Sequence, residues 1–253
     1  MNSAKEARKA ALTRQVVSNI KKQLGAGKAK MAASYVEQCF RRVPVEDLIL
    51  NSPQTLAAIV MGQLEFIKTR APGEVLVRVF NPRLDTDGWE SPHTIIEMVN
   101  DDRSFLVDSV SLTCSEMDLG IHLIIHPVIR IGRDDKGRLT AVYSNETRKG
   151  LPESIMQFQV DRRTGAADME NIRSRLIAVF RDVRWAVEDW RKMEDRAGET
   201  AQQMVEWGAK TDPGWMEEYQ AFLDWLHQEH FVFLGARDYV VVRDKKEGEL
   251  QIV

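Results

Sequence analysis

The spacing of hydrophobic residues changes twice along this chain of 253 residues, and this change constrains the fold more than any other feature. From residue 12 to residue 24 a hydrophobic side chain recurs at every fourth position, as on one face of a helix. From residue 75 to residue 80 valines alternate with other side chains, as in a strand. From residue 172 to residue 193 the spacing returns to steps of four and three, which is typical of a long helix. The chain therefore belongs to the α+β class.

Short sequence signals predict where the first helices begin and end. Gly25 ends the first helix, and a second short helix is expected over residues 30–41. Ser52 followed by Pro53 combines an N-cap hydroxyl with proline at the first helical position. A third helix is therefore expected from Pro53 to about residue 69, and the Ala-Pro-Gly sequence that follows stops it.

The middle of the chain predicts a sheet with one helix in it. The expected elements are strands over residues 75–80, 94–100, 121–131, 139–143 and 154–160, and a helix over residues 105–117. Pro127 restricts the third strand to a sheet edge, a bulge or two short strands. The helix is a crossover, which suits two parallel strands, whereas the short turn at residues 134–137 joins an antiparallel pair. This pattern is the beginning of a split βαβ, ferredoxin-like sheet.

The hydrophobic seam of residues 172–193 allows two interpretations. The seam could form a coiled-coil stem, or the helix could lie on the sheet and bury it. The second interpretation is favoured because the flanking charges form no consistent ladder. Trp190 is expected to anchor helix packing, whereas the roles of Trp207 and Trp215 stay open between packing and a partner surface.

A second β-containing unit is expected toward the C-terminal end. The expected elements are a helix over residues 216–227, strands over 231–234 and 239–242, a turn at 245–248 and an apolar stretch at 250–253. Because the chain stops within that stretch, we expect it to be a fragment of a longer polypeptide.

Composition excludes several classes of protein. The longest apolar run, residues 56–61, is far shorter than the roughly 20 residues of a membrane-spanning helix, and the N-terminus lacks an apolar secretory core. Cys39 and Cys114 are too few for a disulfide framework or a thiolate metal site, so free thiols in a reducing compartment are expected. Residues 1–42 carry ten Lys and Arg against two Glu, and we interpret them as solvated helix faces rather than an organelle presequence or a nucleic-acid arm.

The sequence offers neither a dinucleotide site nor a metal site. It contains no G-x-G-x-x-G, and the glycine-rich stretch at residues 25–28 lacks the Ser or Thr that a phosphate loop needs after its lysine. His122 and His126 lie about 13 Å apart if they share a strand, too far for one ion. His227 and His230 have no further ligands nearby in the sequence. We therefore expect no cofactor and no metal in this segment.

Five collinear stretches of the chain resemble the N-terminal part of the large-subunit, NAD-specific glutamate dehydrogenases of bacteria. They are residues 70–74 with 77–82, residues 100–102 with 105–110, residues 121–128, residues 181–183 with 186–190, and residues 230–235. The resemblance extends from about residue 40 to residue 240. It implies ACT-like regulatory or scaffolding modules at the N-terminus and a dehydrogenase domain much further along the chain.

With this resemblance, the expected fold is α+β. It consists of N-terminal helices, a ferredoxin-like or ACT-like antiparallel or mixed sheet with helices on one face, a long helix, and the start of a second β unit. The expected domains are a helical lead-in over residues 1–70, an ACT-like domain over residues 71–197, and a helical connection leading into a truncated second ACT-like unit over residues 198–253.

The ACT comparison also implies a place for a small effector. The order of strand, acidic turn, helix, glycine and strand resembles the ACT pattern, and the effector-binding residues that it implies are Asp102, Arg103, Ser104, Gly120 and His122. ACT modules that bind amino acids usually have a glycine in the turn that leads into the helix. This chain has Arg103, Ser104 and Phe105 there.

The resemblance implies a parent enzyme that converts L-glutamate, NAD and water to 2-oxoglutarate, ammonia and NADH. Both NAD and the catalytic residues would lie outside this segment, which is expected to be a non-catalytic regulatory and assembly part in the cytoplasm. The expected partners are the rest of the polypeptide, further copies in a homo-oligomer, and a small amino-acid effector. No membrane is expected as a partner.

Two alternative functions stay open beside this one. The first is an amino-acid-sensing ACT module. The second, from a different class, is a ferredoxin-like module that binds RNA with the basic N-terminal segment as a helper. RNA binding requires aromatic side chains that stack on bases, and the strands expected over 94–100 and 121–131 have none. The sequence therefore favours the regulatory hypothesis over RNA binding.

Overall fold

The computed structural model divides into two compact units, Met1–Arg181 and Asp182–Val253, which are described separately. The structure describes residues 2–24, 26–144, 146–208, 213–231, 233, 235–237, 239, 241–243 and 250–252. The divide falls inside one helix, α7 (Ala166–Glu188). The three-domain division expected from the sequence stays a prediction.

The described part of the first unit begins with four helices, of which the sequence predicts all but the short third one. They are α1 (Asn2–Gln23), α2 (Ala26–Phe40), the short α3 (Val45–Leu48) and α4 (Pro53–Phe66). The hydrophobic face of α1 is buried at Val16 and Ile20, which are 0% and 1% exposed. At the start of α4, the Ser52 Oγ accepts a hydrogen bond of 3.0 Å from the Thr55 N–H, as an N-cap does. The basic side chains expected to be solvated, such as Arg14, are mostly exposed.

The described residues of this unit form a six-stranded sheet with two helices in its connections. Its elements are β1 (Leu76–Phe80), α5 (Leu84–Asp87), β2 (Thr94–Asp101), α6 (Leu106–Glu116), β3 (Ile121–Ile125), β4 (Val128–Arg133), β5 (Leu139–Tyr143) and β6 (Leu151–Val160). The strand order is β1-β2-β6-β4-β5, and β3 pairs with β6 on the side away from β2. Pro127 separates β3 from β4, so the expected third strand is two short ones.

Every pairing between these described strands is antiparallel. Both β2 and β3 run antiparallel to β6, so they are parallel to each other with β6 inserted between them. This is the split βαβ arrangement that the crossover helix α6 predicts. The turn after Arg133 joins β4 and β5 as the expected antiparallel pair.

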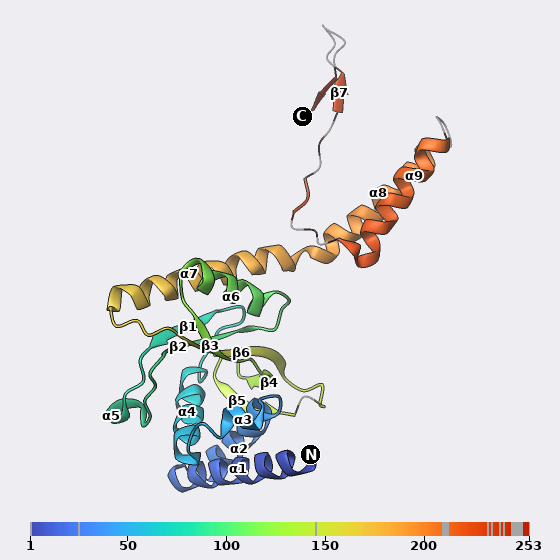
Figure 1. Cartoon of the computed structure of the whole chain (residues 1–253). Helices are drawn as coiled ribbons and strands as arrows, with labels where there is room; N and C mark the ends of the chain where they lie inside the picture. The colour runs from blue at the N-terminus through green and yellow to red at the C-terminus, as the bar shows by residue number, and fades with distance from the viewer. Residues whose placement is uncertain are drawn as a thin grey trace. The chain divides into compact units, whose positions relative to one another are not determined.

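Helices cover both faces of the sheet (Figure 1). Helices α6 and α7 lie on one face, as expected, and α1, α2 and α4 cover the other, which the sequence did not place. On that second face Val99 and Ile155 join the core of the N-terminal helices. Met98 and Phe158 point to the α6 and α7 side because side chains alternate along a strand. As a result, β2 is buried from Thr94 to Asn100.

The face under the N-terminal helices also buries charged groups. Arg70, 3% exposed, contacts Asp101 at 2.6 Å and Glu153 at 3.2 Å. Arg133 donates two hydrogen bonds to Glu153, of 2.7 and 2.9 Å. Because buried charges are tolerated only when they are paired, this network links the end of α4 to β2, β4 and β6.

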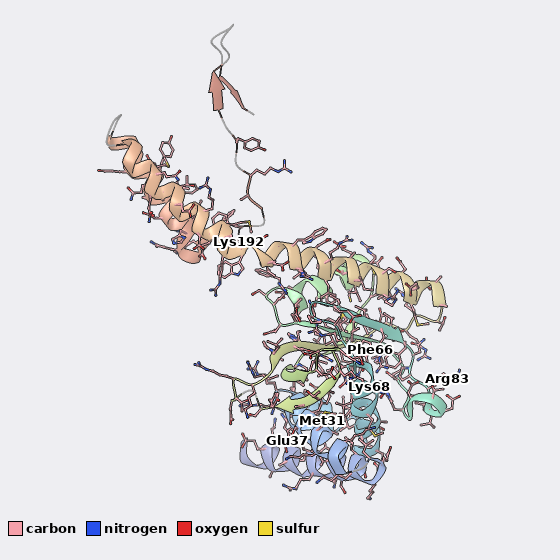
Figure 2. All side chains as sticks on the ribbon, turned by 180° about the vertical axis from the view of Figure 1, so that it is seen from behind. Met31, Glu37, Phe66, Lys68, Arg83 and Lys192 are labelled. Carbon is pink, nitrogen blue, oxygen red and sulfur yellow. The ribbon has the colours of Figure 1, made fainter. Side chains whose placement is uncertain are left out.

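A second buried pair lies beside α4 on the same face. Arg78 of β1 pairs with Glu97 of β2. The Arg78 guanidinium also lies 4.7 Å from the ring centre of Phe66 and 4.5 Å from that of Phe80. Figure 2 labels Phe66 at the end of α4, next to the exposed Lys68. Stacking on two rings and the ion pair together hold Arg78 between α4 and the sheet.

The second unit is built mainly from helices. It contains the end of α7, α8 (Trp190–Gly208), α9 (Pro213–Trp225), a π-helical turn (Leu226–His230) and the antiparallel pair of β7 (Val241–Arg243) and β8 (Leu250–Ile252). Helix α9 packs against α8. None of the described helices combines the length and hydropathy that spanning a bilayer requires.

Three features of this region differ from the sequence predictions. The long helix is interrupted at Asp189, a residue type favoured at helix starts, and resumes as α8. Trp190 is 36% exposed rather than buried in packing, and Arg191 lies over its ring at 5.3 Å. Phe231 and Phe233, expected in a strand, belong to none, and the described partner of β7 is β8.

The start of the long helix follows the favoured interpretation. Ile172 and Leu176 are 2% and 0% exposed, so the seam is buried in the first half of α7. The side chains of Trp207 and Trp215 and the expected turn at residues 245–248 lie outside the described residues.

Candidate functional site

The first three predicted effector residues follow the end of β2. The Asp102 N–H donates to the Pro152 carbonyl at 3.2 Å. Arg103 lies 3.7 Å from the Asp101 carboxylate, which already binds Arg70. Ser104 is exposed. This end of the sheet therefore presents a carboxylate, a guanidinium that is already engaged, and a hydroxyl.

The other two predicted residues bind a common carboxylate at the start of β3. The Gly120 N–H donates to Asp161 Oδ2 at 2.9 Å, and His122 Nε2 lies 2.8 Å from Asp161 Oδ1. These contacts, with His122 first, lower the pKa of the Asp161 carboxyl. A Cβ on Gly120 would lie 2.8 Å from the Asp161 carboxylate, so glycine permits this close approach.

The structure does not bring these two groups together. Asp101, next to Asp102, pairs with Glu153 of β6, whereas Ile121, next to His122, pairs with Val160. Seven positions along β6 correspond to about 23 Å. One small ligand therefore contacts either Asp102 or His122, and the predicted effector site consists of two separate places.

Phe105 holds the turn into α6 in a conformation that normally favours glycine. Its φ of 67° and ψ of 6° are left-handed, and its side chain is 46% exposed. The left-handed region costs a residue with a Cβ about 1–2 kcal/mol. The turn therefore has the backbone shape that a glycine would adopt, while the Phe105 ring occupies the space that a glycine leaves open.

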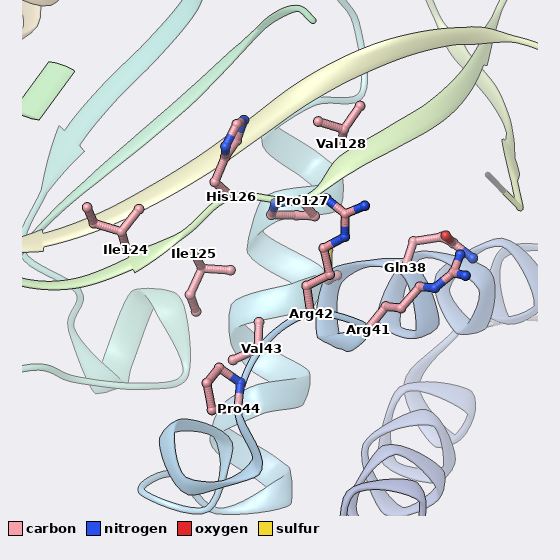
Figure 3. A pocket seen from close by; sticks show the side chains of 11 residues that line it. Gln38, Arg41, Arg42, Val43, Pro44, Ile124, Ile125, His126, Pro127 and Val128 are labelled. Carbon is pink, nitrogen blue, oxygen red and sulfur yellow. The ribbon is translucent and has the colours of Figure 1, made fainter. Parts of the chain in front are cut away.

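A different cavity lies where the end of α2 meets the corner between β3 and β4. Its volume is about 160 Å³. The residues that line it are Gln38, Cys39, Arg41, Arg42, Val43, Pro44, Ile124, Ile125, His126, Pro127 and Val128. Figure 3 shows the Arg42 side chain extending from the end of α2 toward Pro127 and Val128. Burial raises the pKa of the Cys39 thiol to about 12, so this thiol is uncharged at neutral pH.

His126 at the rim of this cavity contacts Ser154 and lies near Asp102. His126 Nε2 lies 2.6 Å from Ser154 Oγ. Burial lowers the pKa of His126, the nearby Asp102 raises it and Arg42 lowers it. Ser154 is 0% exposed, so no substrate reaches its hydroxyl. No hydrogen bond joins His126 to the exposed Asp102 among the described residues, so the His126–Ser154 contact is structural and these residues do not form a nucleophilic triad.

We expect the stability of the chain to fall as the pH drops through the range near 6.5 and below. The unfolded chain binds a proton on His126 near pH 6.5, whereas the folded chain binds it only at a lower pH, so protons favour unfolding in that window. Thermal melts between pH 5.5 and 7.5, as chosen conditions, measure this loss.

The substitution His126→Gln is expected to make that loss smaller. Part of the loss of stability at low pH is expected to remain, because desolvation also lowers the pKa of His93. A pH dependence identical in the two proteins would show that His126 does not contribute to it.

The other sequence candidates for chemistry are engaged elsewhere. His227 Nδ1 lies 3.0 Å from the Glu194 carbonyl, and His230 Nδ1 lies 3.0 Å from the Trp225 carbonyl. Burial raises the pKa of the Cys114 thiol to about 11, so it stays protonated at neutral pH and is a poor nucleophile. Gly25 of the glycine-rich stretch lies outside the described residues.

The cavity residues Gln38, Arg41 and Arg42 are not among the residues predicted from the sequence. The two arginines were counted only as part of the basic N-terminal segment. Their spacing of three and four from Gln38 places all three on one side of the helix end. That signal was present in the sequence, but the opposing wall of β3 and β4 is about 85 residues away along the chain.

Comparison with known proteins gives consistent results. The family model described as "Glutamate dehydrogenase, ACT1 domain" matches residues 35–176. The NAD-specific glutamate dehydrogenase of Halomonas elongata is 32% identical over 256 residues, which cover 100% of this chain and 16% of that protein. The enzyme of the same name from Pseudomonas aeruginosa is 25% identical over 246 residues, which cover 96% of this chain and 15% of that protein. The chain thus spans about one sixth of the length of these relatives.

Proposed function

Because the chain belongs to the ACT1-domain family of glutamate dehydrogenases, we propose that it is a non-catalytic regulatory and assembly segment of an NAD-specific glutamate dehydrogenase. The parent enzyme converts L-glutamate, NAD and water to 2-oxoglutarate, ammonia and NADH. NAD and the residues that direct hydride transfer belong to the dehydrogenase domain of the parent, outside this segment.

The extent of the family match is the observation that carries this proposal. Residues 35–176 contain all six described strands of the sheet, together with α6 and the buried first half of α7. The two curated relatives are about six times longer than the chain, which leaves room for the dehydrogenase domain. The sequence has no G-x-G-x-x-G at any strand-to-helix turn.

The assembly part of the proposal rests on the hydrophobic core that the N-terminal helices share with the sheet. The N-terminal helices and the sheet share one hydrophobic core, so they form a rigid body to which other parts of the parent can attach. We propose that this body contacts the rest of the polypeptide and further copies in a cytoplasmic homo-oligomer. Within this proposal, residues 1–70 are the helical lead-in and residues 71–197 are the ACT-like part of the chain.

The structure disfavours RNA binding by the sheet. Ferredoxin-like RNA-binding modules stack bases on an open sheet face. Here helices lie over both faces of the sheet (Figure 1), and β2, which lies between β1 and β6, is buried from Thr94 to Asn100. A base would have to displace a helix to reach the central strands.

We expect the purified chain of 253 residues to form no NADH from L-glutamate and NAD, because its sequence contains no G-x-G-x-x-G to hold the dinucleotide pyrophosphate. The measurement is the absorbance of NADH, with a complete NAD-specific glutamate dehydrogenase assayed in parallel. NADH formation in proportion to the concentration of the chain would contradict the non-catalytic assignment.

Deletion of this segment from the parent enzyme tests the positive part of the proposal. We expect the truncated enzyme to change its oligomeric state in light scattering, or its response of rate to substrate concentration, while each remaining subunit still binds NAD. A truncated enzyme with unchanged size and unchanged kinetics would contradict a regulatory and assembly role.

A further inference from the structure

Helix α9 of the second unit has an apolar face that is too wide for one neighbouring helix to cover. At about 100° per residue, an arc of about 160° contains the positions of its large apolar side chains Tyr219, Phe222, Leu223 and Trp225. A surface helix needs an apolar stripe of roughly 100° to pack on its core. Within the described part of the second unit, α8 is the helix that lies along α9 (Figure 1). This one neighbour therefore covers only part of the face.

The part of the face left open is a stack of aromatic rings. Phe222 is 56% exposed, and Trp225 is 46% exposed. Their ring centres lie 6.2 Å apart, and the Trp225 ring also stacks on His230 of the π-helical turn at 5.1 Å. His230 Nδ1 lies 3.0 Å from the Trp225 carbonyl, which holds the last ring in place. Single exposed aromatic side chains are common, whereas a contiguous set marks an interaction surface.

The helix that carries these rings is also acidic. Its sequence contains Glu217, Glu218 and Asp224 and no Lys or Arg. Glu218 is exposed, and it lies between Phe222 and Trp225 around the helix because it precedes them by four and seven positions. Two copies of this face brought together would place like charges side by side, which is unfavourable. The face is therefore suited to a partner that is apolar and carries Lys or Arg, rather than to a second copy of itself.

We propose that the aromatic face of α9, defined as Tyr219, Phe222, Trp225 and His230, docks on a part of the parent polypeptide outside this chain. This inference rests on the proposed function, and it names the surface through which the segment contacts the rest of the enzyme. The curated relatives are about six times longer than the chain, so ample polypeptide is present to cover the face. The partner surface is an apolar groove with a Lys or Arg opposite Glu218, which is the pattern of helix-in-groove recognition.

Hydrogen exchange of the α9 backbone amides, followed by mass spectrometry, tests this docking in the chain of 253 residues and in the complete parent enzyme. In the parent, Phe222→Ala is expected to accelerate the exchange about tenfold or more, because truncating a buried aromatic side chain favours local opening. In the chain of 253 residues the same substitution is expected to change the exchange less than about threefold, because Phe222 is already exposed there. The β2 amides, in the other unit, should exchange at an unchanged rate and show that the fold is intact.

Three further variants of the parent complete the design. Glu218→Lys is expected to accelerate α9 exchange about fivefold or more, because it places a positive charge against the basic residue of the partner. Glu217→Lys is its matched control, since Glu217 is also exposed but lies about 100° away around the helix. Leu84→Ala removes an exposed apolar side chain of the other unit. Both controls are expected to leave α9 exchange unchanged.

Four results would overturn the proposal. Equal acceleration by Phe222→Ala in the chain and in the parent would show that the chain itself covers the face. No acceleration in the parent would show that nothing covers it. Equal effects of Glu218→Lys and Glu217→Lys would exclude a basic partner. Slower α9 exchange in the chain at rising protein concentration would show that a second copy is the occupant.

This test and the test of the proposed function fail in different ways. A parent protein that forms no NADH from L-glutamate would contradict the proposed function, whatever the exchange rates are. A parent that forms NADH, but whose α9 amides respond to Phe222→Ala no more than those of the chain, would contradict the docking surface alone.

Discussion

Glu153→Leu is expected to lower the free energy of unfolding by about 3–5 kcal/mol. Glu153 is 2% exposed and accepts hydrogen bonds from Arg133, and it also pairs with Arg70 at 3.2 Å. Without Glu153, Arg133 loses its carboxylate partner. Arg70, which is itself buried, keeps Asp101 as an ion-pair partner. Chemical denaturation followed by circular dichroism measures the change.

Lys68→Ala is the control for this substitution. Lys68 pairs with Glu65 at 2.9 Å, but both side chains are largely exposed, so water screens the pair. We expect a change of less than about 0.5 kcal/mol. If Glu153→Leu costs no more than Lys68→Ala, the buried network does not stabilise the unit.

Gly137→Ala is expected to destabilise the chain by about 2–4 kcal/mol. Gly137 has a φ of 73°, and an added Cβ would lie 2.9 Å from the Arg70 carbonyl carbon and closer still to its oxygen. The Gly137 carbonyl also accepts hydrogen bonds of 3.0 Å from the Arg70 N–H and 2.8 Å from Arg133. The turn would have to shift, and the shift would strain both bonds. The midpoint of chemical denaturation reports the loss.

Gly62→Ala is the matched control, with the opposite sign. Gly62 lies within α4, and an added Cβ would be at an ordinary 3.6 Å from the Arg78 guanidinium. Alanine favours helices over glycine by up to about 1 kcal/mol. We expect Gly62→Ala to stabilise the chain slightly. Equal destabilisation by both substitutions would show that loss of glycine in general, rather than the turn geometry, causes the effect.

Local signals in the sequence predicted most of the elements. The Ser52–Pro53 start, the Pro127 interruption and the turn after Arg133 are all confirmed. Each of these depends on neighbouring residues, because capping hydroxyls, proline rings and short turns act within a few positions of the chain. The crossover helix correctly predicted that β2 and β3 are parallel.

The effector site was harder to predict because it depends on which strand lies between β2 and β3. The pattern of strand, turn, helix, glycine and strand placed Asp102 and His122 in one site. The insertion of β6 between those strands puts these residues beside opposite ends of it. Residue spacing along one segment carries no information about a strand that enters the sheet later.

The amino-acid sequence by itself determined the class of fold, the positions of most of the helices and strands, and the likeness to glutamate dehydrogenases. Those properties follow from hydrophobic periodicity, local backbone preferences and ordered residue matches. Tertiary structure alone decided that α1, α2 and α4 cover the second sheet face, and that Arg41 and Arg42 meet the β3–β4 corner. The reason is that packing between distant segments depends on the complementarity of whole surfaces, which no local pattern encodes.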